Sequence, residues 1–262
     1  MVRPKVCVLR TAGTNCDKET AFAFAKAGAE ADLVHVNSLV SATIDLHEYS
    51  ILAFPGGFSY GDDIASGKVF ANELRCKLGE ELREFVKDGK LIIGICNGFQ
   101  ILVKSGLLPG NDLLKQETSL IINDSGKFES RWAYLKTKNN CVWTKSLPKV
   151  IYLPVAHGEG KFVAKDKKTL ERLKKNKQII FQYCDADGEF AGYPENPNGS
   201  TDHIAGICDE TGRILGLMPH PERHVLRQQH PRWTQNKKNM EGDGLQIFKN
   251  GVEYAKKHFG EA

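Results

Sequence analysis

One cysteine lies in a turn whose residues suit nucleophilic chemistry. Residues 94–98 read Gly-Ile-Cys-Asn-Gly. The first two of them are the end of an almost wholly apolar run, residues 90–95. Glycines two before and two after the cysteine permit a tight strand-to-helix elbow that exposes the central side chain, as in the G-x-S-x-G pattern of serine enzymes. Unpaired N–H groups and the helix dipole at that point would stabilise a thiolate. We therefore predict that Cys96 is a nucleophile and that the N–H of Asn97 is an oxyanion donor.

The remaining cysteines are expected to be structural. A cysteine after an apolar strand is usually a small buried hydrophobic side chain, and none of the others has the glycine setting of Cys96. The total of seven is odd and contains no Cys-x-x-Cys pair, so we predict neither a disulfide framework nor a metal site. The six structural cysteines are Cys7, Cys16, Cys76, Cys141, Cys184 and Cys208.

His220 is the best-placed base among the eight histidines because it directly follows an apolar strand candidate, 214–218. Pro221 favours an extended conformation at His220. In an extended segment Glu222 would project to the same side and hold one ring nitrogen while the other serves Cys96. We predict that these three residues form a catalytic triad. Without Cys96, a polar surface turn would be the better interpretation of His-Pro-Glu.

A second glycine-rich segment, 55–63, also follows a strand candidate. Adjacent glycines let the backbone approach a ligand, so Gly57 is predicted to be the second oxyanion donor. The segment does not match a nucleotide-binding P-loop, because five residues rather than four separate Gly61 from Gly67 and because Val69 stands where Ser or Thr is required. We therefore predict no ATP site on this chain.

The composition is that of an ordinary globular protein. The 262 residues are 41% apolar and 26% charged, with a net charge of +4, which excludes disorder and fibrous repeats. The apolar runs are too short for a membrane span or a secretory signal, so a cytoplasmic location is expected. The basic run 165–177 lacks the interleaved aromatic residues that stack on bases, and we interpret it as a solvated helix rather than a nucleic-acid site.

Strands and helices alternate in the first hundred residues, the pattern of an open, doubly wound, mostly parallel α/β sheet. Strand candidates there are 5–9, 32–36, 50–54 and 90–95, with helices after residue 15 and from about 69 to 87. The second half adds strand candidates at 119–122, 132–136, 150–155, 178–183, 204–208 and 214–218, and a terminal helix at 245–258. No linker divides the chain, so a single domain over 1–262 is predicted.

Together these motifs resemble those of the class I (triad-type) glutamine amidotransferases, a family with a flavodoxin-like fold. Its signature is Gly-Ile-Cys-x-Gly-x-Gln with a distant His-Pro-Glu, and both are present. Four further segments resemble the glutaminase component of phosphoribosylformylglycinamidine synthase, and the likeness runs from about residue 5 to 255. These segments are 56–62, 154–160, 197–200 and 218–223.

The resemblance implies a reaction and a partner. Glutamine would be hydrolysed through a Cys96 thioester, and the ammonia passed to a separate ATP-dependent synthetase that makes formylglycinamidine ribonucleotide from formylglycinamide ribonucleotide in purine synthesis. It implies that Gly57 and Asn97 are oxyanion donors and that Gln100 and Arg131 lie near the L-glutamine. Segment 157–160 would face the pocket rim or the synthetase. ATP and magnesium would belong to the partner, leaving no cofactor on this chain.

Alternatives remain open at this stage. The chain could serve another amidotransferase, or it could be a cysteine peptidase or chaperone of related fold, although those carry a histidine where this chain has Asn97. A catalytically silent binding module is disfavoured by the intact triad. Residues 228–243, with Trp233, Lys237 and Lys238, are either part of a partner interface or a plain surface loop. They leave open whether assembly needs a small third subunit.

Overall fold

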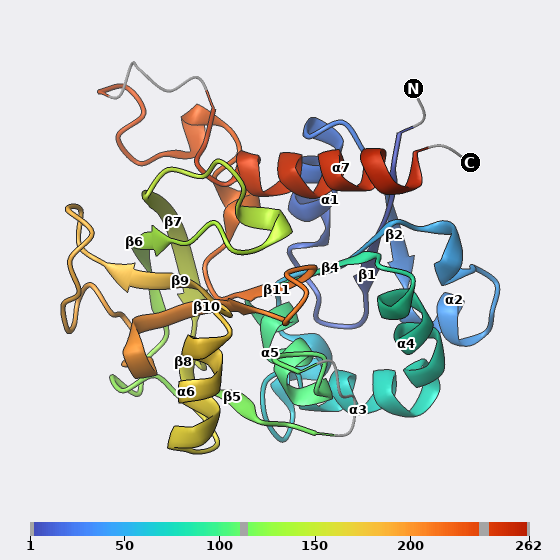
Figure 1. Ribbon diagram of the computed structural model, residues 1–262, viewed down its shortest axis with the longest axis horizontal. Coiled ribbons are helices and arrows are strands. Elements are labelled where there is room, and N and C mark those ends of the chain that lie inside the picture. The colour runs from blue at the N-terminus through green and yellow to red at the C-terminus, as the bar shows by residue number, and fades with distance from the viewer. Residues whose placement is uncertain (1–2, 111–114, 236–240, 261–262) are drawn as a thin grey trace.

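The computed structural model describes residues 3–110, 115–235 and 241–260 (Figure 1). Within them a nine-stranded sheet runs through the molecule. Its strands are β1 (Lys5–Arg10), β2 (Glu30–His35), β3 (Ile51–Phe54), β4 (Leu91–Ile95), β6 (Glu129–Thr137), β7 (Val150–His157), β9 (Ile179–Cys184), β10 (Ile204–Cys208) and β11 (Ile214–Leu217). The strand order is β2-β1-β3-β4-β11-β10-β9-β6-β7.

The sheet has a parallel half and an antiparallel half. Strands from β2 to β11 pair in parallel, whereas β10, β9, β6 and β7 continue the sheet through antiparallel pairs. Every residue of β3 and β4 is buried, as expected for parallel strands with helices on both faces. The predicted α/β sheet with added antiparallel strands is therefore confirmed.

Helices cover both faces of the parallel half, with α1 and α7 on one side and α3 and α5 on the other (Figure 1). The helices are α1 (Asp17–Lys26), α2 (Val36–Val40), α3 (Lys68–Lys77), α4 (Gly79–Lys87), α5 (Asn97–Ser105), α6 (Lys167–Lys175) and α7 (Leu245–Phe259). Short 3-10 turns are η1 (Leu46–Glu48), η2 (Ser59–Asp62), η3 (Val142–Thr144), η4 (Thr201–His203), η5 (Pro221–Arg223) and η6 (Arg227–Gln229). No helix in these described ranges is both long and apolar enough to span a membrane.

Two sequence predictions needed correction. The single helix expected over 69–87 is wrong, because Leu78 has a φ of −130° and separates α3 from α4; Gly79, a weak helix former, follows directly. Strand β8 (Lys161–Ala164) was not predicted. It pairs with β5 (Thr118–Ile121) in a separate two-stranded sheet.

Helix α5 is the element that positions the site. All of its residues are buried, because it lies under the sheet beside α3. Even Lys104 is only 4% exposed, and its Nζ donates to the Ser66 carbonyl at 2.5 Å. The first residues of α5 thus meet the loops that leave β3 and β11 at the carboxyl edge of the parallel strands, where ligands bind in open α/β sheets.

Candidate active site

Cys96 occupies a strained turn between β4 and α5. Its backbone has φ 53° and ψ −106°, a conformation that L-residues rarely adopt and that often marks a functional site. The Cys96 N–H donates to the Leu217 carbonyl at 2.8 Å, which ties the turn to β11. The side chain is 6% exposed. This is the elbow geometry that the glycine spacing predicted.

The flanking glycines are required by close packing. A Cβ on Gly98 would lie 1.9 Å from the Phe54 carbonyl oxygen, and one on Gly94 would lie 2.6 Å from the Gly98 carbonyl oxygen. Both distances are far below van der Waals contact. A side chain at Gly98 would push α5 away from β3, and a side chain at Gly94 would push α5 away from β4.

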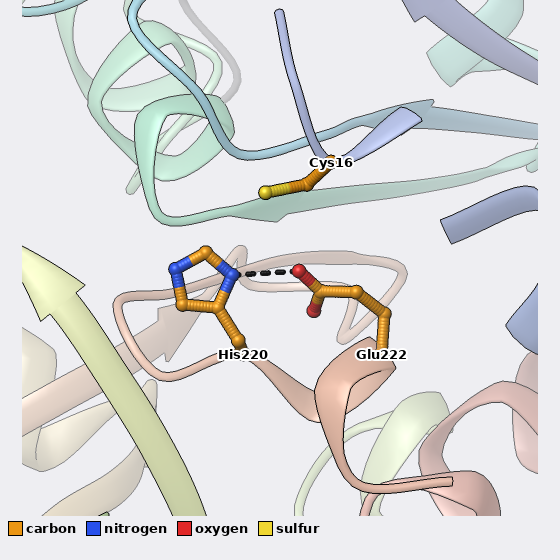
Figure 2. A group of neighbouring side chains, drawn as sticks. All are labelled: Cys16, His220 and Glu222. Carbon is orange, nitrogen blue, oxygen red and sulfur yellow. Dashed lines mark hydrogen bonds and ion pairs between the residues drawn. The ribbon is translucent and has the colours of Figure 1, made fainter. Parts of the chain in front are cut away.

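His220 and Glu222 form a buried pair at the end of β11 (Figure 2). His220 Nδ1 lies 2.6 Å from Glu222 Oε1, and the two residues are 1% and 0% exposed. The His220 N–H donates to the Pro154 carbonyl at 2.8 Å, which fixes the backbone against β7. The expected extended conformation is present at His220 but wrong for Glu222, which lies in the 3-10 turn η5. The turn, rather than strand periodicity, brings the carboxylate to the ring.

The environment of His220 favours its protonated form. Burial by itself would lower the pKa of His220, but the Glu222 carboxylate and the Cys96 sulfur raise it well above its ordinary value. His220 Nε2 is buried and has no hydrogen-bond partner among the described residues. With Nδ1 held by Glu222, Nε2 is the nitrogen left to exchange a proton with Cys96 or with a substrate.

His157, the other buried histidine nearby, is unsuited to acid–base work. Burial, reinforced by the nearby His220, lowers the pKa of His157 to about 4. Its Nδ1 lies 3.1 Å from Asn123 Oδ1, which holds the ring in place. His157 is therefore neutral near pH 7. It lines the cavity beside Cys96 with Gly158 and Glu159, and the expectation for segment 157–160 was that it faces the pocket rim or the synthetase.

Cys16, which sequence reasoning assigned a structural role, lies directly against this pair (Figure 2). Its Sγ accepts a hydrogen bond from Arg223 at 3.0 Å, and burial raises the pKa of the Cys16 thiol. Ligand atoms of Cys16, His220 and Glu222 all lie within 4.8 Å of one another. Its position just after β1, at the carboxyl edge of the parallel strands, was the signal that could have pointed to it.

The same three residues fit a metal ion poorly, although their spacing would allow one. The Arg223 guanidinium already donates to the Cys16 sulfur, and a second cation there would be repelled. The backbone of Gly56 also closes over them, since a Cβ at Gly56 would lie 2.8 Å from His220 Cε1 and 3.1 Å from Cys16 Sγ. Cys16 and Glu222 are thus better suited to hold the His220 imidazole than to bind a metal ion. The absence of a metal site stays a prediction.

Both predicted oxyanion donors adjoin Cys96. Asn97 is the first residue of α5, where a backbone N–H has no acceptor within the helix. Gly57 lines the same cavity as Cys96. Its φ of 142° and its close approach to Asn15 N, 2.7 Å from an added Cβ, explain why glycine is needed there. Their role as oxyanion donors stays a prediction.

A cavity of about 160 Å³ opens beside Cys96. Described residues that line it are Gly57, Phe58, Asp62, Ser66, Cys96, Gln100, Phe128, Ala156, His157, Gly158 and Glu159. Gln100, predicted to bind substrate, is among them, and its Nε2 donates to the Glu159 carbonyl at 2.7 Å. Residues of the elbow, of the glycine-rich loop and of segment 157–160 therefore line the same small cavity.

Arg131 lies elsewhere. It lines a separate cavity of about 490 Å³ together with Trp132 and Arg232, and it is absent from the described lining of the Cys96 cavity. Its guanidinium pairs with Glu129 at 2.7 Å and donates to the Tyr193 hydroxyl at 2.6 Å. A contact with substrate therefore stays a prediction, and nothing in this arrangement brings the side chain to Cys96.

The segment 228–243 packs in part against the antiparallel half of the sheet. The His230 ring contacts Trp132 and Tyr152, with ring centres 5.6 Å apart in each case. Trp233 is 42% exposed. Lys237 and Lys238 lie outside the described residues, and both earlier interpretations of the segment stay open.

Comparisons with known proteins agree with this site. The family description "CobB/CobQ-like glutamine amidotransferase domain" fits residues 3–255. A phosphoribosylformylglycinamidine synthase subunit PurQ of Dehalococcoides mccartyi is 50% identical, with 98% of this chain and 99% of that protein covered. A PurQ subunit of Methanococcus maripaludis is 48% identical, with the same coverage.

A solved structure is similar as well. One chain in the structure of PurLQS from Thermotoga maritima matches with a TM-score of 0.75 and 33% sequence identity, covering 97% of this chain and 100% of that chain. The identity of the relatives extends over almost the whole length of each protein. The chain therefore belongs to the class I glutamine amidotransferases and, within them, to the PurQ family of phosphoribosylformylglycinamidine synthase subunits.

Proposed function

We propose that this chain is the glutaminase subunit of phosphoribosylformylglycinamidine synthase. It hydrolyses L-glutamine and delivers ammonia to an ATP-dependent synthetase subunit, which converts formylglycinamide ribonucleotide to its amidine in purine biosynthesis. The observation that carries the proposal is the strained Cys96 elbow opening on a small cavity beside a buried His220–Glu222 pair, in a chain of the PurQ family.

The geometry supports a two-step mechanism. The Cys96 thiolate attacks the side-chain amide carbon of glutamine, and the N–H groups of Gly57 and Asn97 stabilise the oxyanion. Protonated His220 gives its Nε2 proton to the departing ammonia, which leaves a thioester on Cys96. Water then attacks the thioester while His220 accepts a proton, and glutamate and the Cys96 thiolate are released. Glu222 holds the imidazole and stabilises its charged form.

The proposed function requires partner subunits. We assign ATP and magnesium to the large PurL synthetase, and we infer that a small PurS subunit joins the assembly, as in the PurLQS structure that this chain resembles. We treat residues 1–262 as a single amidotransferase domain, because the nine-stranded sheet and one connected core extend through the described residues. A cytoplasmic location stays a prediction of the sequence.

Reconstitution tests the function directly. Mixing the chain with PurL and PurS should let glutamine replace ammonium as the nitrogen donor for amidine formation, with glutamate released in equal amount. Product would be followed by chromatography in the presence and absence of this chain. Glutamine hydrolysis without any transfer to the amidine would point to a different amidotransferase, and no hydrolysis in any mixture would contradict the glutaminase assignment.

Replacing Glu222 by glutamine should change the pH dependence. The raised pKa of His220 keeps the imidazolium present until the pH rises through that value. With a neutral amide beside it, burial dominates and the pKa falls. We expect the alkaline limb of the glutaminase kcat/KM profile to move to lower pH by about one unit.

The matched control for this prediction is Glu19→Gln. Glu19 is a carboxylate 3.7 Å from Arg223 and its side chain is 40% exposed, so its replacement should leave the profile in place. An unchanged alkaline limb in Glu222→Gln would show that Glu222 does not sustain the charge on His220.

A further inference from the structure

Cys16 is a buried thiol that the proposed two-step mechanism does not use. Figure 2 shows its sulfur beside the contact between His220 and Glu222. The backbone of Cys16 is fixed there, because its N–H donates to the Gly56 carbonyl at 3.2 Å and its carbonyl accepts from the Thr20 hydroxyl at 2.7 Å. The fold therefore sets the position of the sulfur relative to the catalytic pair.

The Cys16 sulfur makes two hydrogen bonds of opposite kind. Its S–H donates to Asn15 Oδ1 at 3.1 Å, and its Sγ accepts from Arg223 Nη2 at 3.0 Å. Cys7, another buried cysteine, forms no side-chain hydrogen bond with another described residue. The contacts of Cys16 are thus those of a polar side chain held in one orientation, and differ from those of a cysteine that only fills space in the core.

Cys16 remains a neutral thiol in this environment. Burial raises its pKa, against the influence of His220 and Arg223, which favour the thiolate. Cys16 is therefore not a second nucleophile, and it places no second negative charge beside Glu222. What it offers its neighbours is a fixed and polarisable acceptor.

Arg223 connects Cys16 to the turn that carries the catalytic carboxylate. Arg223 directly follows Glu222 in η5, and its hydrogen bond to Cys16 crosses from that turn to the segment before α1. The other charged partner of Arg223 is Glu19, 3.7 Å away with a side chain that is 40% exposed. An ion pair so exposed contributes little, so the contact with Cys16 is the buried part of this attachment.

The titratable side chains that face His220 come from four parts of the fold. They are Glu222 on η5, Cys96 between β4 and α5, Cys16 before α1 and His157 on β7. Burial lowers the pKa of His220, whereas Glu222, Cys96 and Cys16 raise it. His157 is neutral near pH 7. Loss of the Cys16 sulfur therefore removes one of the three influences that favour the imidazolium.

We propose that Cys16 is a positioning residue for the catalytic base: it accepts from Arg223, attaches η5 to the segment before α1, and so holds the His220 imidazole against Glu222. The inference rests on the proposed function, since it concerns the base of that reaction. Cys16 is absent from the described lining of the Cys96 cavity, so it acts through His220 and not on the substrate. A displacement of about 1 Å in a catalytic group can cost about 100-fold in rate.

The first test measures His220 in the isolated full-length chain. The imidazole is titrated by nuclear magnetic resonance of histidine-labelled protein, and its signal is identified by its loss in His220→Gln. Cys16→Ala should lower the titration midpoint by about half a pH unit, because the charged ring loses a polar neighbour while its burial remains. Cys16→Ser keeps an acceptor for Arg223 and should restore most of the midpoint.

Cys7→Ala is the matched control, because it removes another buried sulfur on β1, away from the catalytic pair. It should lower stability and leave the His220 midpoint in place. An unchanged midpoint in Cys16→Ala would overturn the inference. A serine variant that behaves like the alanine variant would overturn it as well, because the sulfur would then act by packing alone.

The second test measures turnover in the complex with PurL and PurS. Cys16→Ala should lower kcat for glutamine about 10-fold with KM changed less than about twofold, and the ammonium-dependent rate should be retained. Arg223→Met removes the donor from the other side of the same contact and should lower kcat to a similar extent. The double variant should lose little more than either single variant. Losses that multiply would show that the two residues act independently and would overturn the inference.

The titration separates this inference from the proposed function, because it needs neither glutamine nor a partner subunit. A lowered midpoint in Cys16→Ala that serine restores supports the positioning role even if the complex makes no amidine. A midpoint that does not move contradicts the role, whatever the activity of the complex.

Discussion

Cys96→Ala is expected to lower glutamine-dependent amidine formation by at least about 10⁴-fold, because triad nucleophiles contribute on this scale or more. The same variant should retain the ammonium-dependent reaction of the complex, since that reaction needs only the synthetase. Loss of one buried sulfur from a residue that is 6% exposed should leave the fold intact. The measurement is the rate with each nitrogen donor, in parallel assays of one preparation.

Cys76→Ala is the matched control, because Cys76 is an exposed cysteine on α3. It should retain both activities. Glutamine-dependent activity of Cys96→Ala close to that of the unaltered chain would exclude Cys96 as the nucleophile. Equal loss of the glutamine-dependent and ammonium-dependent rates would instead show that the substitution disturbs assembly.

Gly98→Ala is expected to damage both stability and activity. The new Cβ would lie 1.9 Å from the Phe54 carbonyl oxygen and 2.9 Å from the Phe54 Cβ, so α5 must move away from β3. We expect the free energy of unfolding to fall by about 3 kcal/mol, at the upper end for overpacking. A shift of the elbow should also reduce the glutaminase rate about 100-fold, since catalysis is sensitive to small displacements.

Gly79→Ala provides the contrast. Gly79 begins α4, and apart from its chain neighbours and the backbone of its own helix, no atom of the described residues lies within 4 Å of a Cβ built there. Alanine should raise the free energy of unfolding by up to about 1 kcal/mol, because it restricts the unfolded chain and favours the helix. Chemical denaturation of both variants measures the difference. A Gly98→Ala protein as stable as the Gly79→Ala protein would contradict the packing argument.

The parallel half of the fold could be predicted from the sequence because its signals are local. Apolar runs such as 90–95 have the composition of strands buried on both faces, and glycine placement around Cys96 specifies the elbow. The boundary between α3 and α4 was missed because the apolar repeat continues through Leu78. Periodicity reports which face is buried and does not report whether the backbone stays helical.

The candidate site could be predicted only in part. A short motif next to a strand predicts that His220 and Glu222 pair, and the structure shows the pair, although Glu222 lies in a 3-10 turn and not in the expected extended segment. Cys16 was overlooked because its nearest functional neighbours are far away in the sequence. Arg223, which donates to its sulfur, is 207 positions along the chain, and no local pattern links the two.

The strands of the parallel half, the elbow and the candidate nucleophile follow from the amino-acid sequence, because each depends on side-chain size, polarity and glycine at fixed short spacings. Strand β8 does not follow from it, and neither does the set of distant loops that meet at the sheet edge. Tertiary packing places Asp62 and Glu159 in the Cys96 cavity and Arg131 in a separate cavity. Strand order and loop packing form the cavity walls and charge pairs, and they bring together residues that have no fixed separation along the chain.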